Sequence, residues 1–173
     1  IGTKFDKEET NREQKEKDMV LILGKGNETY QKLKKETIYF NDMEEALSCA
    51  KWCIDQLEAQ PDIDNKFYFM TKPDGSIATE ADGAEFIDNK KLKQCYWECG
   101  FAMMLMDRLY QITKDEKYLG YAKRYMEFLF TCAEDTWSYW GSGKAALGCA
   151  MYYSFTGDER AMEAAVKFID FVV

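Results

Sequence analysis

The chain has 173 residues, of which 46% are hydrophobic, and a formal net charge of −8. This length and composition suit one domain with a hydrophobic core, and the negative charge argues against nucleic acids and anionic membrane surfaces as partners. The sequence contains no histidine, which excludes Ser-His-Asp and Cys-His catalysis and leaves acid/base chemistry to Asp, Glu, Tyr, Lys or Cys.

The N-terminal residues 1–18 are highly charged, with eleven charged side chains among residues 4–18. This charge density predicts an arm outside the core, so we expect a single domain over residues 19–173. No apolar run approaches ~20 residues, and we therefore expect no membrane-spanning helix. The chain reads as a soluble protein, cytoplasmic or secreted, and its first residue, Ile1, leaves open a processed chain or part of a longer one.

A helix is predicted at residues 41–58, because its apolar positions match those of a second helix at residues 115–130. An insertion follows at residues 59–93. Within it, the sequence Lys-Pro-Asp-Gly-Ser separates two short apolar runs, and Pro followed by Gly is a strong turn signal. The insertion is therefore expected to hold a small β-hairpin near residues 67–79.

The C-terminal half of the chain is an internal repeat. Residues 94–130 and 137–173 match at an offset of 43, with ten identical positions, among them Trp97/Trp140 and Gly100/Gly143. A period of this length is typical of stacked helical hairpins. Residues 41–58 are then a degenerate earlier repeat.

The two helices of each repeat differ in character. Residues 95–112 and 140–155 are apolar on nearly all sides, which is typical of buried helices, whereas residues 115–130 and 158–172 are amphipathic. Threonine and acidic residues at the junctions predict tight turns and capped outer helices. The expected fold is therefore all-α, a partial α/α toroid of inner and outer helices whose inner helices line a concave side.

Six cysteines include two pairs four residues apart, Cys49/Cys53 and Cys95/Cys99. They could form a four-thiolate metal site or a disulfide-linked hairpin, or could be small side chains packed between helices. The packing interpretation is favoured, because metal motifs usually use a closer spacing in tight loops. We expect no metal and no cofactor.

Candidate site residues gather at the predicted starts of the inner helices, which an array of this kind brings to one face. Aromatic rings there can stack on the C–H surface of a sugar, and carboxylates can bind hydroxyls or act as acid and base. The alternatives are that the tryptophans pack between repeats and that Glu98 is a solvated charge in the first turn of its helix. The catalytic candidates are Glu98, and Asp135 and Asp82 in loops that could reach the same face. The substrate-binding candidates are Tyr96, Trp97, Trp137, Tyr139, Trp140 and Lys144.

The second copy, with its Tyr-Trp-x-x-Gly start at Tyr139 and its Thr-Gly-Asp-Glu-Arg turn at Thr156, resembles the hairpin of six-hairpin α/α-toroid proteins. These include the unsaturated-glucuronyl hydrolases and, more distantly, the N-acylglucosamine 2-epimerases. The resemblance implies an α/α toroid that acts on a sugar. In the hydrolases an Asp pair follows a Trp on an inner helix, and here Glu98 and Cys99 stand at that place. Six such repeats need roughly 260 residues, so this array is a partial toroid.

These features predict a carbohydrate-active enzyme, a hydrolase, lyase or isomerase that uses carboxylate acid/base chemistry on a small sugar-like or cyclic molecule. One alternative is a non-catalytic helical-repeat module for binding or assembly, in which an exposed apolar edge favours a homo-oligomer or the remainder of a longer chain. Another is a cyclase or isomerase for an apolar cyclic substrate, although the sequence has no DDxxD or DxDD motif.

Overall fold

The computed structural model describes residues 30–32, 37–39 and 41–173. Contacts divide the chain into a first unit that ends at Asp42 and a second unit, Met43–Val173. In the first unit, strands β1 (Tyr30–Lys32) and β2 (Thr37–Tyr39) pair antiparallel, with Tyr30 opposite Tyr39. This hairpin is an addition to the predicted elements, and the predicted arm at residues 1–18 lies outside the described residues.

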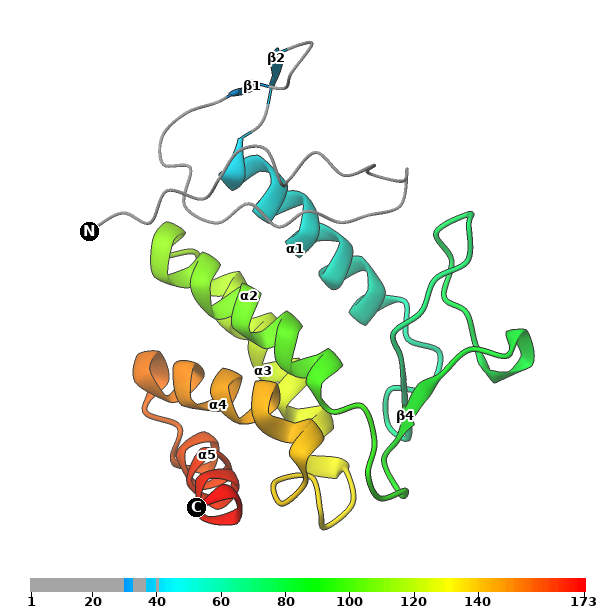
Figure 1. Ribbon diagram of the computed structural model, residues 1–173, viewed down its shortest axis with the longest axis vertical. Helices are drawn as coiled ribbons and strands as arrows, with labels where there is room; N and C mark the ends of the chain where they lie inside the picture. Colours follow the sequence, from blue (N-terminus) through cyan, green and yellow to red (C-terminus); the bar gives the residue numbers. More distant parts are fainter. Residues whose placement is uncertain (1–29, 33–36, 40) are drawn as a thin grey trace, which may run out of the picture. The chain divides into compact units, whose positions relative to one another are not determined.

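The second unit is mostly helical, as predicted (Figure 1). Each predicted inner or outer helix is present, with bounds within about three residues of those expected. The helices are α1 (Asp42–Glu58), α2 (Trp97–Thr113), α3 (Glu116–Thr131), α4 (Gly143–Thr156) and α5 (Glu159–Val172). Within the described residues, each helix is too short or too polar to span a membrane. The partial toroid stays a prediction that rests on the repeat.

The turn between α2 and α3 and the turn between α4 and α5 have the same capping residue and the same backbone shape. Asp115 and Asp158 cap α3 and α5 by accepting the backbone N–H of Lys117 and Arg160, each at 3.1 Å. Each turn also needs one residue with positive φ, and Gly157 supplies it between α4 and α5 at φ 69°. The first copy holds Lys114 there at φ 60°, a conformation that costs a non-glycine residue more. The predicted capped turns are confirmed.

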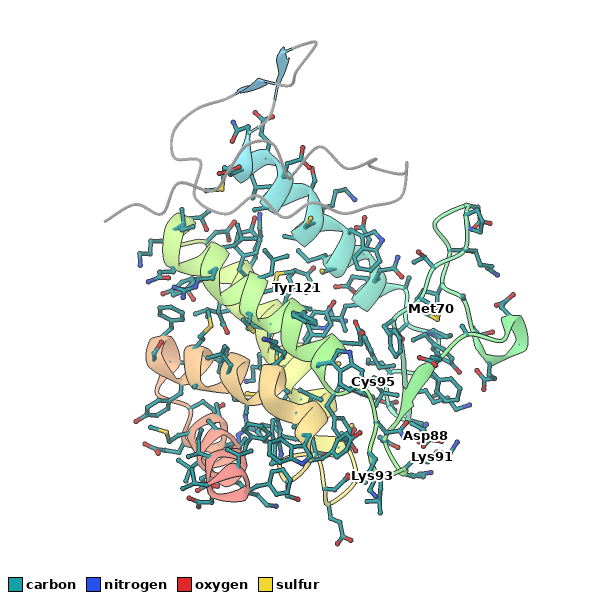
Figure 2. The ribbon with its side chains drawn as sticks, viewed as in Figure 1. Met70, Asp88, Lys91, Lys93, Cys95 and Tyr121 are labelled. Carbon is teal, nitrogen blue, oxygen red and sulfur yellow. The ribbon has the colours of Figure 1, made fainter. Side chains whose placement is uncertain are left out.

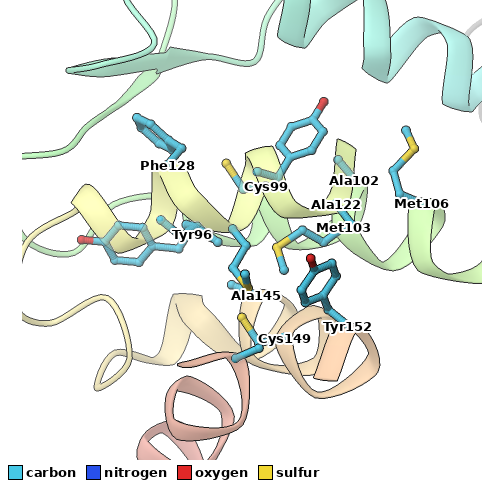
Figure 3. Packing of buried hydrophobic residues seen from close by; sticks show 14 of the residues in the cluster. Tyr96, Cys99, Ala102, Met103, Met106, Ala122, Phe128, Ala145, Cys149 and Tyr152 are labelled. Atoms are coloured by element: carbon cyan, nitrogen blue, oxygen red, sulfur yellow. The ribbon is translucent and has the colours of Figure 1, made fainter. Parts of the chain in front are cut away.

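Helices α2 and α4 are neighbours and make the most extensive helix contact in the described part of the chain (Figure 1). A Cβ on Gly100 would lie 2.3 Å from the backbone nitrogen of Ala145, and a Cβ on Gly148 would lie 2.9 Å from the Cβ of Met103. The two backbones therefore approach only because glycine has no side chain. Around this crossing the core fills with the buried side chains seen in Figure 3, including Tyr96, Cys99, Met103, Met106 and Cys149.

The insertion forms the predicted hairpin only at its tip, where Thr71 pairs with Ile77 and Ala78 donates its backbone N–H to Met70 O at 2.9 Å. The turn is present, since Lys72 donates its backbone N–H to Ser76 O at 2.8 Å and Gly75 has φ 85°. However, β3 (Lys66–Tyr68) pairs with β4 (Phe86–Asp88), not with residues 77–79. The pairing with β4 brings Phe67 opposite Ile87, and both side chains are buried, so burial decides the register.

All six cysteines are free thiols. Cys99 and Cys149 are completely buried in the helix core, and burial raises the pKa of the Cys149 thiol to about 12. These two cysteines agree with the packing interpretation, whereas Cys49 is exposed. Among the described residues, no group of three or more histidine, cysteine or acidic side chains is placed to hold a metal ion.

Candidate functional site

The first turns of α2 and α4 share a surface hollow, as the repeat suggested. We call it the Trp140 depression; it measures about 330 Å³ and is lined by Trp97, Trp140, Gly141, Gly143, Lys144 and Leu147. The structure thus brings together three of the predicted substrate-binding residues, Trp97, Trp140 and Lys144. No acidic residue lines this depression.

The two tryptophans are held by different neighbours. Trp140 belongs to a short 3-10 turn, Trp140–Ser142 (η3), and its ring packs edge-on against Phe171 with centroids 5.5 Å apart. It is nevertheless 72% exposed. The Trp97 ring lies against Gly141, where a Cβ would come within 2.8 Å of the indole. The depression therefore has one fixed indole and one that largely faces solvent.

Glu98 is half-buried and accepts the indole N–H of Trp97 at 2.9 Å. It does not line the Trp140 depression. Instead, Glu98 lines a second hollow between α1 and α2. Lys144 lines the Trp140 depression, and its ammonium nitrogen lies 5.8 Å from the centroid of the Phe101 ring. Phe101 is one of the residues that line the second hollow.

Tyr96 and Asp135 hold the loops together. Tyr96 is completely buried and donates its hydroxyl to Asp135 Oδ1 at 2.9 Å, while Asp135 Oδ2 accepts the backbone N–H of Lys93 at 2.7 Å. Burial, and then the Asp135 carboxylate, raise the pKa of Tyr96 well above its usual range. Figure 2 shows Lys93 and Cys95 on the segment that leads from β4 into α2. Asp135 therefore ties this segment to the loop that precedes α4.

The remaining predicted site residues also lie away from the depression. Trp137 is buried against Phe130, with ring centroids 5.7 Å apart, and the Tyr139 ring packs edge-on against Tyr96 at 6.3 Å. Asp82 closes the 3-10 turn Glu80–Asp82 (η2) by accepting the backbone N–H of Thr79 at 2.9 Å. Asp82 also lies 3.6 Å from the ammonium nitrogen of Lys72. These side chains make structural contacts in their loops.

The second hollow contains residues that the sequence reasoning missed. We call it the Trp52 cavity; it measures about 170 Å³ and has walls from α1, β3, α2 and α3. Glu98 is the one carboxylate that lines either hollow in the described part of the chain. In the sequence, the one sign of this cavity is that several separate segments each carry an aromatic residue. Its lining residues are Trp52, Cys53, Gln56, Phe67, Phe69, Glu98, Phe101, Ala102, Leu105 and Tyr125.

A comparison of the chain with protein-family models, with curated proteins and with solved structures finds no match. The resemblance to six-hairpin toroid proteins therefore stays a prediction from the repeated residues.

Proposed function

We propose that the protein binds a small sugar-like ring compound in the Trp140 depression. The observation that carries this proposal is the pair of indoles, Trp97 and Trp140, beside the ammonium group of Lys144. Indole faces stack on the C–H surface of a sugar ring, and an ammonium group donates hydrogen bonds to hydroxyls or to the carboxylate of an acidic sugar. The ligand class that fits best is thus a ring with one apolar face and a negative or hydroxylated edge.

The geometry supports binding more than hydrolysis. Glycoside hydrolysis by acid/base chemistry usually requires two carboxylates that flank the bond to be broken. Asp135 and Asp82 are engaged in loop contacts, and Glu98 faces the other hollow. A carbohydrate-active enzyme remains the prediction of the sequence, and ligand binding is the part of it that this site supports.

The test is titration of the protein with glucuronate and with glucose, followed by shifts in backbone amide NMR signals. We expect glucuronate to bind with a Kd on the order of 1 mM, which suits a shallow site, and more tightly than glucose. Trp140→Ala should abolish both interactions, and Lys144→Gln should remove the preference for glucuronate. The matched control is Ile112→Ala, which truncates an exposed side chain of α2 that does not line the depression. Unchanged binding by Trp140→Ala would exclude this site.

A second candidate function is self-association through α5. Positions related by the repeat are buried in the first hairpin and exposed in the second: Met126 is 0% exposed and Ile169 54%, and Leu119 is 8% exposed and Met162 36%. The face they belong to, which we call the α5 face, runs along the helix at a spacing of three or four residues. It consists of Met162, Val166, Ile169 and Val173.

We infer that a second copy of this chain covers the α5 face. In the first hairpin the equivalent side chains, Leu119 and Met126, are buried, and a second copy of this chain offers an apolar surface that could bury the α5 face in the same way. A two-fold pairing of identical α5 faces closes on itself. Contiguous apolar surface of this kind marks interaction sites.

Sedimentation velocity over a wide concentration series tests this second candidate. We expect a dimer that dissociates on dilution, and Ile169→Lys should leave only monomer. Ile112→Lys places the same charge on an exposed isoleucine of α2 and should still dimerise. Because Ile169 does not line the Trp140 depression, a monomeric Ile169→Lys variant that still binds glucuronate would separate the two functions.

A further inference from the structure

The Trp52 cavity is walled by five aromatic side chains: Trp52 of α1, Phe67 and Phe69 in and just after β3, Phe101 of α2 and Tyr125 of α3. Two of these rings are held by contacts with other residues of the cavity wall. The Tyr125 hydroxyl donates to the backbone oxygen of Cys53 at 2.7 Å, and the Phe67 ring packs edge-on against Tyr125 with centroids 5.6 Å apart. The inner wall is thus formed before any ligand arrives. Trp52 and Phe101, which are 49% and 53% exposed, form the mouth.

Glu98 and Gln56 line the cavity beside these aromatic rings, and each has a side-chain oxygen that can accept a further hydrogen bond. Glu98 receives one hydrogen bond from Trp97, and no lysine or arginine of the described residues forms a salt bridge with it. Gln56 is 7% exposed, and its side-chain oxygen is buried without a hydrogen-bond partner within the described part of the chain. An unpaired buried carbonyl costs about 1–3 kcal/mol, which an N–H donor would offset.

The residues that line the Trp52 cavity favour a positively charged ligand. Aromatic ring faces carry negative potential and attract an ammonium group, and a neighbouring carboxylate adds to this attraction. A neutral apolar molecule would desolvate Glu98 without pairing it, which is unfavourable.

We propose that the Trp52 cavity binds a small primary or secondary ammonium compound. Its charged N–H groups would donate to Glu98 and Gln56, while its hydrocarbon part would contact the aromatic walls. A quaternary ammonium has no N–H and would leave both acceptors unpaired. The volume of about 170 Å³ is below the usual range for drug-sized ligands, so the occupant is small.

The experiment uses three probes of similar size and different charge on the full chain: phenethylammonium, 2-phenylethanol and 3-phenylpropanoate. Isothermal titration calorimetry and amide NMR shifts at Trp52 and Phe101 report binding. We expect phenethylammonium to bind at least about tenfold more tightly than the alcohol, a difference of about 1.4 kcal/mol, and the anion not to bind. Equal affinity for ammonium and alcohol, or no binding of the ammonium, overturns the proposal.

Two variants assign the binding to the cavity. Glu98→Gln keeps an oxygen that can accept from Trp97, so it should weaken phenethylammonium about tenfold and leave 2-phenylethanol unchanged. Glu134→Gln removes an exposed carboxylate in the loop before α4 and is the matched control. Trp52→Leu should weaken both probes. If Glu98→Gln still binds 2-phenylethanol, its cavity is intact. If it also binds phenethylammonium as tightly as the unchanged chain does, the proposed role of Glu98 is wrong.

Discussion

Asp107 is a carboxylate in the core with nothing to neutralise it. It lies on α2, is 0% exposed, and neither of its oxygens has a hydrogen-bond partner among the described residues. Burial raises the pKa of Asp107 from 3.8 to about 7. Its electrostatic neighbours on α4 are Cys149 and Tyr152, and the Asp107 charge contributes to the raised pKa of both. The equivalent position in the second repeat is Ala150, so the repeat itself does not require an acid here.

The raised pKa makes Asp107 destabilising at neutral pH. Below about pH 4 the carboxyl is protonated in both the folded and the unfolded chain, and its ionisation does not affect stability. Between about pH 4 and pH 7 the unfolded chain ionises first, so the folded state holds more protons and stability falls as pH rises. The difference between 3.8 and about 7 corresponds to a loss of about 4 kcal/mol at most, at about 1.4 kcal/mol for each pH unit.

The test is urea unfolding of the protein and of Asp107→Asn at about pH 4.5 and about pH 7.5, because asparagine has a similar shape and no titration. The stability of Asp107→Asn relative to the unchanged chain should rise by about 3 kcal/mol between the two pH values. The other carboxylates titrate in both proteins, so this difference isolates Asp107. A relative stability that does not change with pH would refute the argument and would mean that water or a partner reaches Asp107 in solution.

Two further predictions concern packing. Gly100→Ala should lower the free energy of unfolding by about 2 kcal/mol or more in the same urea assay, since its Cβ would lie 2.3 Å from the backbone of Ala145. Gly120→Ala in α3 has no atom within 4 Å of its Cβ, so it should raise the free energy of unfolding by about 0.5–1 kcal/mol. Equal effects of the two substitutions would contradict the close approach of α2 and α4. Maleimide should modify the exposed Cys49 in the folded protein and leave the completely buried Cys99 and Cys149 unmodified until urea is added, as read by mass spectrometry. Early labelling of Cys99 or Cys149 would show that the core opens.

The helical hairpins could be predicted from the sequence because their determinants are local. Apolar spacing of three and four residues defines each helix. At each junction a threonine donates its hydroxyl to the last turn of the preceding helix, and an aspartate caps the next helix. The repeat also singled out Gly100, whose lack of a side chain lets α4 approach α2. These features depend on a few neighbouring residues, so two copies 43 residues apart suffice to recognise them.

The candidate site could be predicted only in part. The repeat placed Trp97, Trp140 and Lys144 at the starts of the inner helices, and these three do share one depression. It could not show that Glu98, one residue after Trp97, lines a different cavity, because the facing direction of a side chain in the first turn depends on the neighbouring helices. The same holds for Asp135, which the structure pairs with the buried Tyr96.

What the sequence determined by itself is the order and the type of the helices, through periodic patterns and caps that act over one or two turns. Only the tertiary structure decided which distant segments meet. Strand β3 pairs with β4 because burial of Phe67 and Ile87 favours that register over the nearer residues 77–79. The Trp52 cavity combines side chains from four elements, and the isolation of Asp107 depends on what packs around α2. Such contacts between distant residues arise when the core closes, and no local pattern in the chain encodes them.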